Sequence, residues 1–261
     1  MYKNFLTFII YGFKNFHSVY NIAYLDLSLK YRRTIFGNGW SILTNLITVS
    51  IISIVWSIIF NIEVKDYFPK IFIGFTSFYF IASFITGSTD ILFGKYKGII
   101  LSLGVGLNII ILRHLMFLIL EFLLFIPVYI IIILALGNKI SLSIFLLIPG
   151  LLLIVINGYW LTFIFSLLSA RFRDLALFIS SIMGAAFLLT PILWDKERLG
   201  EYEDFVYLNP LTSMIEAIRN PLIGEAINPL IYLVLLFSII IGFFICSIFY
   251  KYKRKLFNFW L

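Results

Sequence analysis

The sequence predicts an all-α integral membrane protein with six transmembrane helices. Of the 261 residues, 62% are hydrophobic and only 13% are charged. Several apolar runs exceed 18 residues, which is long enough for a helix to cross the hydrocarbon core of a bilayer. Polar turns separate six such segments within what we expect to be a single domain, 1–261. The expected spans are residues 41–60, 71–93, 109–136, 142–168, 175–192 and 230–250.

The first 39 residues are expected to form an amphipathic helix on the cytoplasmic surface of the membrane. They carry five Lys or Arg residues against a single acid, Asp26. Apolar and aromatic residues recur at helical spacing, namely Phe16, Val19, Tyr20, Ala23, Tyr24 and Leu27. This pattern is typical of a helix lying in the plane of the interface. The N-terminus has no small-residue cleavage site, so we expect no cleaved signal peptide.

The distribution of positive charge predicts the orientation of the chain. Six spans place both termini on one side, and 14 of the 20 Lys and Arg residues fall on that side. The other side holds Lys65, Lys70, Lys139, Lys196, Arg198 and Arg219. Because an excess of Lys and Arg marks the cytoplasmic side, we expect a multi-pass protein of the cytoplasmic (inner) membrane with both termini cytoplasmic. Topology and anionic membrane lipid explain the net charge of +7, so nucleic acid is not an expected partner.

The longest polar segment, residues 195–219, follows the fifth expected span. Four of its apolar residues, Leu208, Leu211, Ile215 and Ile218, recur at spacings of three and four, which predicts one face of a short helix. A polar loop free in solution would not need such a face. We therefore expect short re-entrant helices between spans five and six, where protein or water covers any irregular backbone.

Two polar side chains are expected near the middle of the bilayer. Glu121 lies in the third span and Asn157 in the antiparallel fourth span. A charged acid at this depth costs about 2.5–3.5 kcal/mol on insertion scales, so it must be protonated or partnered. The structural interpretation is a hydrogen bond between a neutral Glu121 and Asn157 or a hydroxyl. The alternative is a proton-coupled site that includes His114, which shares the helical face of Glu121.

The sequence offers no set of residues suited to catalysis, metal binding or nucleotide binding. It contains two His, His17 and His114, and one Cys, Cys246, which cannot form a usual zinc site. It has neither a cluster of acid, base and nucleophile nor a G-x-x-x-x-G-K-[ST] loop for phosphates. We therefore expect a transport subunit rather than an enzyme, with no catalytic residue, metal or cofactor of its own.

Three stretches carry a resemblance to a known family. The first runs from Lys30 to Trp40, KYRRTIFGNGW, and ends in a Gly-x-x-Trp pattern. The second combines Arg173-Asp174 with Thr190-Pro191-Ile192-Leu193-Trp194. The third is Asn209-Pro210-Leu211, with Arg219 ten residues after Asn209. In this order and on six spans, the chain resembles the permease subunit of type-2 ABC exporters. Within them it is similar to the polysaccharide branch, which exports O-antigen, capsule and teichoic acid.

The resemblance implies a homodimer of this chain that works with two copies of a separate ABC ATPase subunit. That partner would bind ATP and Mg²⁺, and the cargo would be a lipid-linked, O-antigen-like glycan. Contact with the ATPase is expected at Tyr31, Arg32, Arg33, Lys95, Tyr96 and Lys97. For the loop at 95–97, the alternative is that its charge reflects only the positive-inside rule.

Aromatic residues of the first and fifth spans are candidates for the glycan path. Flat rings can meet the C–H faces of sugars without selecting one sugar, and the expected positions are Trp56, Phe60, Phe187 and Trp194. An interfacial aromatic belt is the alternative explanation for the two tryptophans. An outer gate is expected at Thr190, Pro191, Asn209, Pro210 and Arg219.

Two other classes of protein are alternatives. An ABC-2 exporter of a drug or small lipid would share the fold, but its deletion would leave surface glycan unchanged. An integral membrane acyltransferase would show a clustered acid, base or nucleophile near one face of the membrane.

Overall fold

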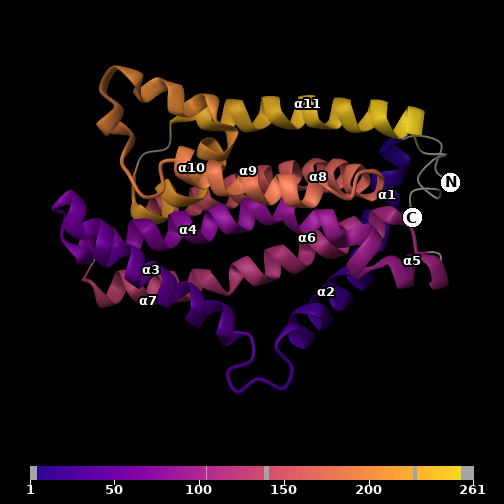
Figure 1. Ribbon diagram of the computed structural model, residues 1–261, viewed down its shortest axis with the longest axis horizontal. Coiled ribbons are helices and arrows are strands. Elements are labelled where there is room, and N and C mark those ends of the chain that lie inside the picture. Colours follow the sequence, from indigo (N-terminus) through magenta and orange to yellow (C-terminus); the bar gives the residue numbers. More distant parts are fainter. Residues whose placement is uncertain (1–4, 104, 138–140, 226–227, 254–261) are drawn as a thin grey trace.

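The computed structural model describes residues 5–103, 105–137, 141–225 and 228–253, and every regular element in these ranges is a helix. Long helices run roughly parallel in a bundle, and the turn between α2 and α3 projects away from it (Figure 1). The elements are α1 (Phe5–Lys14), α2 (Phe16–Lys30), α3 (Gly39–Phe60), α4 (Val64–Thr86), η1 (Gly87–Asp90), η2 (Ile91–Lys95), α5 (Lys97–Leu103), α6 (Leu107–Leu123), α7 (Phe125–Ala135), η3 (Leu142–Leu146), α8 (Leu147–Arg171), α9 (Leu175–Leu189), η4 (Lys196–Leu208), α10 (Pro210–Ile223) and α11 (Pro229–Lys253). The prediction of an all-α fold is confirmed.

Helix α4 is the centre of the bundle, and α3, α6, α7, α8, α9 and α10 all contact it. Its side chains are buried on nearly every side, including Phe72, Ile73, Ile81 and Phe84. An all-round apolar helix reaches this state only when other helices cover it. Past Thr86 the helix tightens into the 3₁₀ turn η1 and then widens into the π-helical turn η2.

Five of the six expected spans are long and apolar enough to cross a membrane. They are Gly39–Phe60, Val64–Asp90, Leu107–Ala135, Leu142–Arg171 and Pro229–Tyr252. The expected fifth span, 175–192, corresponds to α9, which has only 15 residues. It ends early because Pro191 disfavours the helical conformation at the residue before it, and Thr190 is accordingly extended at φ −96°, ψ 136°. The third span is interrupted at Leu124, one turn before Pro127, whose ring cannot follow an unbroken helix.

Between α9 and α11 the chain forms two short helical segments. The first, η4, is a 3₁₀ segment broken at Gly200, where φ is 56°. The second, α10, begins at Pro210, where the side chain of Asn209 accepts a hydrogen bond from the Leu211 amide at 3.0 Å. Of the apolar face predicted here, Ile215 and Ile218 are buried, while Leu211 is half-buried. The side chain of Leu208 lies outside the described residues.

Helix α10 packs closely against α4, α8 and α11. At the contact with α8, a Cβ added to Gly150 would lie 2.6 Å from the carbonyl oxygen of Ala217, so only glycine permits this approach. The packed face explains why the polar segment carries apolar residues at helical spacing.

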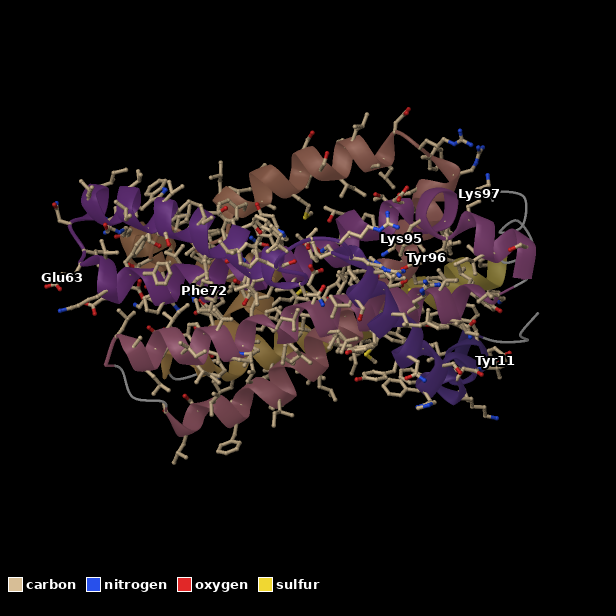
Figure 2. The ribbon with its side chains drawn as sticks, turned by 90° about the horizontal axis from the view of Figure 1, so that it is seen from below. Tyr11, Glu63, Phe72, Lys95, Tyr96 and Lys97 are labelled. Atoms are coloured by element: carbon tan, nitrogen blue, oxygen red, sulfur yellow. The ribbon has the colours of Figure 1, made fainter. Side chains whose placement is uncertain are left out.

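The helices divide the loops between two ends of the molecule. In Figure 1, α1, α5 and the C-terminal end of α11 lie at one end, and the segment containing η4 lies at the other. Rings of Phe5 and Phe8 meet Tyr250, with centroids 5.8 and 5.2 Å apart, which ties α1 to the end of α11. Figure 2 likewise shows Glu63 far from Lys95, Tyr96 and Lys97. The two ends of the molecule thus correspond to the two sides of the membrane to which the Lys and Arg residues were assigned from the sequence.

We predict that single cysteines report these two ends as two sides of the membrane. After Cys246→Ala removes the native thiol, a cysteine in place of Glu203 should react with an impermeant maleimide on intact cells. A cysteine in place of Lys97 should react only after permeabilisation. Labelling of the Lys97 position from outside would overturn the predicted orientation.

Candidate functional site

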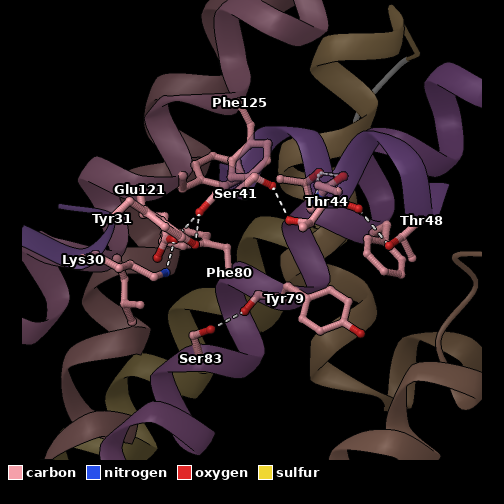
Figure 3. A pocket seen from close by; sticks show the side chains of 15 residues that line it. Lys30, Tyr31, Ser41, Thr44, Thr48, Tyr79, Phe80, Ser83, Glu121 and Phe125 are labelled. Atoms are coloured by element: carbon pink, nitrogen blue, oxygen red, sulfur yellow. Dashed lines mark hydrogen bonds and ion pairs between the residues drawn. The ribbon is translucent and has the colours of Figure 1, made fainter. Parts of the chain in front are cut away.

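A pocket of about 380 Å³ lies between the end of α2, α3, α4 and the α6–α7 pair (Figure 3). It is lined by Lys30, Tyr31, Ser41, Thr44, Asn45, Thr48, Phe75, Thr76, Tyr79, Phe80, Ser83, Leu118, Glu121, Phe122 and Phe125. Its volume is in the range of small-molecule sites, roughly 300–1,000 Å³. The lining combines hydroxyl and amide groups with aromatic rings.

The polar wall of this pocket comes from one face of α3. Ser41, Thr44, Asn45 and Thr48 recur at spacings of three and four, so they share a face of the helix. Other positions on α3 are apolar and exposed in the single chain, among them Ile47, Ile51, Ile54 and Ile58. Helix α3 therefore turns a polar face to the pocket and apolar faces to its surroundings.

Glu121 forms an ion pair with Lys30 in the wall of the pocket. Its Oε1 also accepts a hydrogen bond from the Ser41 hydroxyl at 3.0 Å, and the hydroxyls of Ser41 and Tyr31 lie 2.7 Å apart. A hydroxyl partner was among the predicted contacts, but the ion pair with Lys30 was not predicted and does not fit the expected neutral Glu121. The three helices α2, α3 and α6 meet at this one carboxylate.

The predicted hydrogen bond between Glu121 and Asn157 is wrong. Asn157 donates to the carbonyls of Leu153 at 2.9 Å and Leu235 at 3.3 Å, and it accepts from the indole nitrogen of Trp160 at 3.0 Å. It therefore connects α8 to α11. Depth along the helices could be counted from the sequence, but the direction in which each side chain points could not, because these helices are apolar on almost every face.

A second charged cluster, which the sequence analysis missed, joins α2 to η2 and α6. Arg113 donates from Nε and Nη2 to the two oxygens of Asp26, each at 2.7 Å, and Tyr96 donates its hydroxyl to Asp26 at 3.1 Å. Burial and the neighbouring Asp26 raise the pKa of Tyr96, so its hydroxyl stays protonated as a donor. The single acid within an otherwise basic N-terminal segment was the signal that could have identified Asp26.

The residues predicted to contact an ATPase fall into exposed and buried groups. Arg32, Arg33 and Lys95 are exposed, whereas Tyr31 and Lys97 are half-buried. Tyr96 is only 2% exposed, so its side chain acts inside the chain rather than on a surface. The ammonium groups of Lys30 and Lys95 lie 5.5 and 4.5 Å from the ring centroid of Phe117, so the two basic segments are neighbours.

The four aromatic residues predicted for a glycan path do not form one cluster. Trp56 and Phe60 contact each other with ring centroids 5.2 Å apart. Phe187 instead packs on α4, against Phe75 at 5.8 Å and Phe78 at 5.1 Å. Trp194 lies beyond the end of α9 and donates its indole N–H to the Leu188 carbonyl at 3.1 Å. All four predicted rings are half-buried.

The residues predicted for an outer gate are brought together. Asn209 donates from Nδ2 to the hydroxyl of Thr190 at 3.0 Å, and Arg219 donates to the Pro191 carbonyl at 2.7 Å. Pro210 follows as the first residue of α10. The two residues that follow α9 are therefore hydrogen-bonded to Asn209, just before α10, and to Arg219 within α10. A gating function stays a prediction.

Beside this contact lies Glu216, which the sequence analysis also missed. Glu216 is 1% exposed, and its Oε1 lies 3.7 Å from Nη2 of Arg219 and 3.9 Å from Nζ of Lys196. Burial raises the pKa of Glu216, and the two cations oppose this shift. The group lines a pocket of about 210 Å³ that also holds Asp195, Glu225 and Lys70. Its position three residues before Arg219, on the same helical face, was the available signal.

Together the helical bundle, its apolar spans and its internally paired charges define a multi-pass membrane protein. The chain belongs to the ABC-2 type transporter family, whose model matches residues 22–223.

Two relatives from Klebsiella pneumoniae are each named O-antigen export system permease protein RfbA. One is 29% identical over 221 residues, which cover 80% of this chain and 85% of the relative. The other is 29% identical over 252 residues, which cover 90% and 96% of the two chains. The resemblance proposed from the three sequence stretches is thereby confirmed.

The raised pKa of Glu216 predicts a pH-dependent cost to stability. The folded state binds the proton more tightly than the unfolded state, so the stabilisation is present at low pH and is lost as pH rises above the ordinary carboxyl value of 4.5. Glu216→Gln, which mimics the protonated form, should therefore gain in melting temperature relative to the unsubstituted chain as the pH rises above this value. The gain should be a few degrees, since 1 kcal/mol corresponds to about 2–4 °C for a chain of this size. Melting curves of the detergent-solubilised protein measure it, and a difference that grows toward acid pH would contradict the assignment.

Proposed function

We propose that this chain is the permease subunit of an ABC transporter that exports a lipid-linked, O-antigen-like polysaccharide across the cytoplasmic membrane. The observation that carries the proposal is the near full-length similarity to O-antigen export permeases, 252 residues at 29% identity. Membership of the ABC-2 family supports a transport function. The pocket of hydroxyls and aromatic rings supports a carbohydrate cargo, because sugars offer hydroxyl edges and apolar C–H faces.

The energy for export would come from a separate ATPase subunit, present in two copies, which binds ATP and Mg²⁺. This proposal rests on the family and on the sequence, which has no phosphate-binding loop of the G-x-x-x-x-G-K-[ST] type. Exposed Arg32, Arg33 and Lys95 are the available contacts. Movement at this surface would be transmitted inward by the Asp26–Arg113–Tyr96 cluster, which links α2 rigidly to η2 and α6.

A homodimer would cover apolar faces that the single chain leaves exposed. Helix α9 buries only Ile179 among its 15 residues, while Leu177, Phe178, Leu188 and Leu189 are exposed. In this assembly α9 would cross the membrane as the fifth span in chain order, which brings the number of crossings to six. The segments η4 and α10 would then be re-entrant. The apolar packing of α10 against α4 and α8 supports that placement.

The glycan would pass along α3 and α9, where the half-buried rings of Trp56, Phe60, Phe187 and Trp194 offer apolar surfaces. Weak contacts of this kind suit transport, since a cargo must leave as readily as it enters. The Thr190–Asn209 and Pro191–Arg219 contacts would form the outer gate. The excess of positive charge at one end supports the orientation with both termini in the cytoplasm.

Deletion of this chain should remove the glycan from the cell surface while the lipid-linked precursor accumulates inside. Staining of intact cells and extraction of lipid-linked glycan measure the two effects, and a plasmid copy of the chain should reverse both. If surface glycan is unchanged and the cells become sensitive to hydrophobic toxins, the chain is instead an exporter of a drug or small lipid.

Reversal of the exposed basic pair should weaken contact with the ATPase. We expect Arg32→Glu combined with Arg33→Glu to reduce co-purification of the ATPase subunit or to uncouple its hydrolysis from export, because the charge at the contact is inverted. Lys65→Glu is the matched control, since Lys65 is exposed at the opposite end of the molecule. Unchanged recruitment and export in the double variant would remove these residues from the interface.

A further inference from the structure

We propose that the pocket between α2, α3, α4 and α6 is a binding site for one neutral sugar unit of the exported glycan, and not for its phosphate linkage. This inference rests on the proposed function and adds to it the chemistry of a single site within one protomer. It depends on three properties of the pocket: its charge, the direction of its hydrogen bonds and its aromatic wall.

The charge of the pocket argues against an anionic ligand. Lys30 and Glu121 are the only ionised residues in the lining, and they neutralise each other in an ion pair. Phosphate recognition usually needs a free cation or an unoccupied helix N-terminus. Here Glu121 already supplies negative charge beside the first turn of α3, where it accepts from Ser41. A diphosphate would meet this carboxylate with no free cation among the lining residues.

Three hydroxyls of the wall donate their protons to the helix backbone and keep their lone pairs. The hydroxyls of Thr44 and Thr48 donate to carbonyls one turn earlier in α3, each at 2.8 Å, and Ser83 does the same in α4 at 2.6 Å. Each hydroxyl has one proton and two lone pairs, so the lone pairs stay available. A row of acceptors selects a ligand rich in O–H donors. Sugars carry such donors, whereas an ionised phosphate carries none.

The opposite wall supplies rings for the apolar faces of a sugar. Tyr79 is 54% exposed and stands across from Thr44 and Thr48 (Figure 3), with its ring 4.6 Å from that of Phe75. Phe80 and Phe122 stack at 4.4 Å deeper in the lining. The negative face of an aromatic ring attracts the polarised C–H groups of a pyranose. Phe75 also contacts Phe187 at 5.8 Å, so the site adjoins the proposed glycan path at α9.

The first test removes the acceptors without changing the shape of the wall. Thr44→Val combined with Thr48→Val should slow the appearance of surface glycan by about fivefold or more, which corresponds to roughly 1 kcal/mol. Thr44→Ser combined with Thr48→Ser keeps the hydroxyls and should export at nearly the normal rate. Co-purified ATPase and elution volume of the complex establish that the valine variant is assembled. Normal export by an assembled valine variant would overturn the site, while loss of glycan on deletion of the chain would leave the proposed function standing.

The second test asks which chemistry occupies the pocket. In the Cys246→Ala background, Asn45→Cys, at a half-buried lining position outside the row of hydroxyls, is reacted with a small maleimide in the purified full-length protein, in the presence of one of three probes. The probes are oligosaccharides released by mild acid from the cell's surface glycan, farnesyl diphosphate, and phosphatidylglycerol in mixed micelles. We expect slower labelling with the oligosaccharides alone. Protection by farnesyl diphosphate or phosphatidylglycerol would assign the pocket to a phosphate headgroup, and absence of protection by any probe would show that no sugar binds there.

Discussion

A chain in lipid must satisfy its polar groups from within, and this constraint determines how the bundle is joined. Water is absent from the bilayer core, so an unpaired charge or amide there is costly. In the described part of the chain, polar contacts of this kind join several of the helices. Asp26 with Arg113 joins α2 to α6, and Glu121 with Lys30 joins α2, α6 and α3. Asn157 joins α8 to α11. Because van der Waals contacts between apolar helices are not directional, these few polar contacts fix which faces meet.

The junctions also explain why α2 belongs to the bundle rather than resting on it. A helix held only by its apolar face could slide along the interface, whereas α2 carries two ion pairs to α6 about one turn apart, at Asp26 and Lys30. Tyr96 extends the first of these to η2. A displacement of the segment that follows α2 would therefore reach Tyr96, beyond the end of α4, and the carboxylate beside the pocket. The same side chains thus support the fold and take part in the binding and coupling proposed above.

The sequence was sufficient to predict the class of fold and most of the spans, because length and apolar content are summed over about twenty residues and small errors cancel. The resemblance to type-2 ABC exporter permeases also indicated Thr190, Pro191, Asn209 and Arg219 as a group. Pro191 and Pro210 in addition mark helix ends through their backbone chemistry. The sequence did not reveal the partner of Glu121. Helices that are apolar on every face give no periodic signal of orientation, so the choice between Asn157 and Lys30 depended on packing. Asp26 and Glu216 entered the prediction only as negative charges in a segment. Their ion pairs with Arg113 and Arg219 depend on packing and on the shared helical face.

The short length of α9 would have a consequence for the membrane around the crossing that we propose for this helix. A helix of 15 residues is about 22 Å long, whereas the hydrocarbon core is about 30 Å thick. Crossing by such a helix creates a hydrophobic mismatch, which the bilayer relieves by thinning locally at a cost of fractions of a kcal/mol per Å. Lipid headgroups from the two leaflets would then approach each other beside α9. Along any part of α9 that still faces lipid in the proposed homodimer, a polar headgroup would have a shorter apolar distance to travel than along a span of full length.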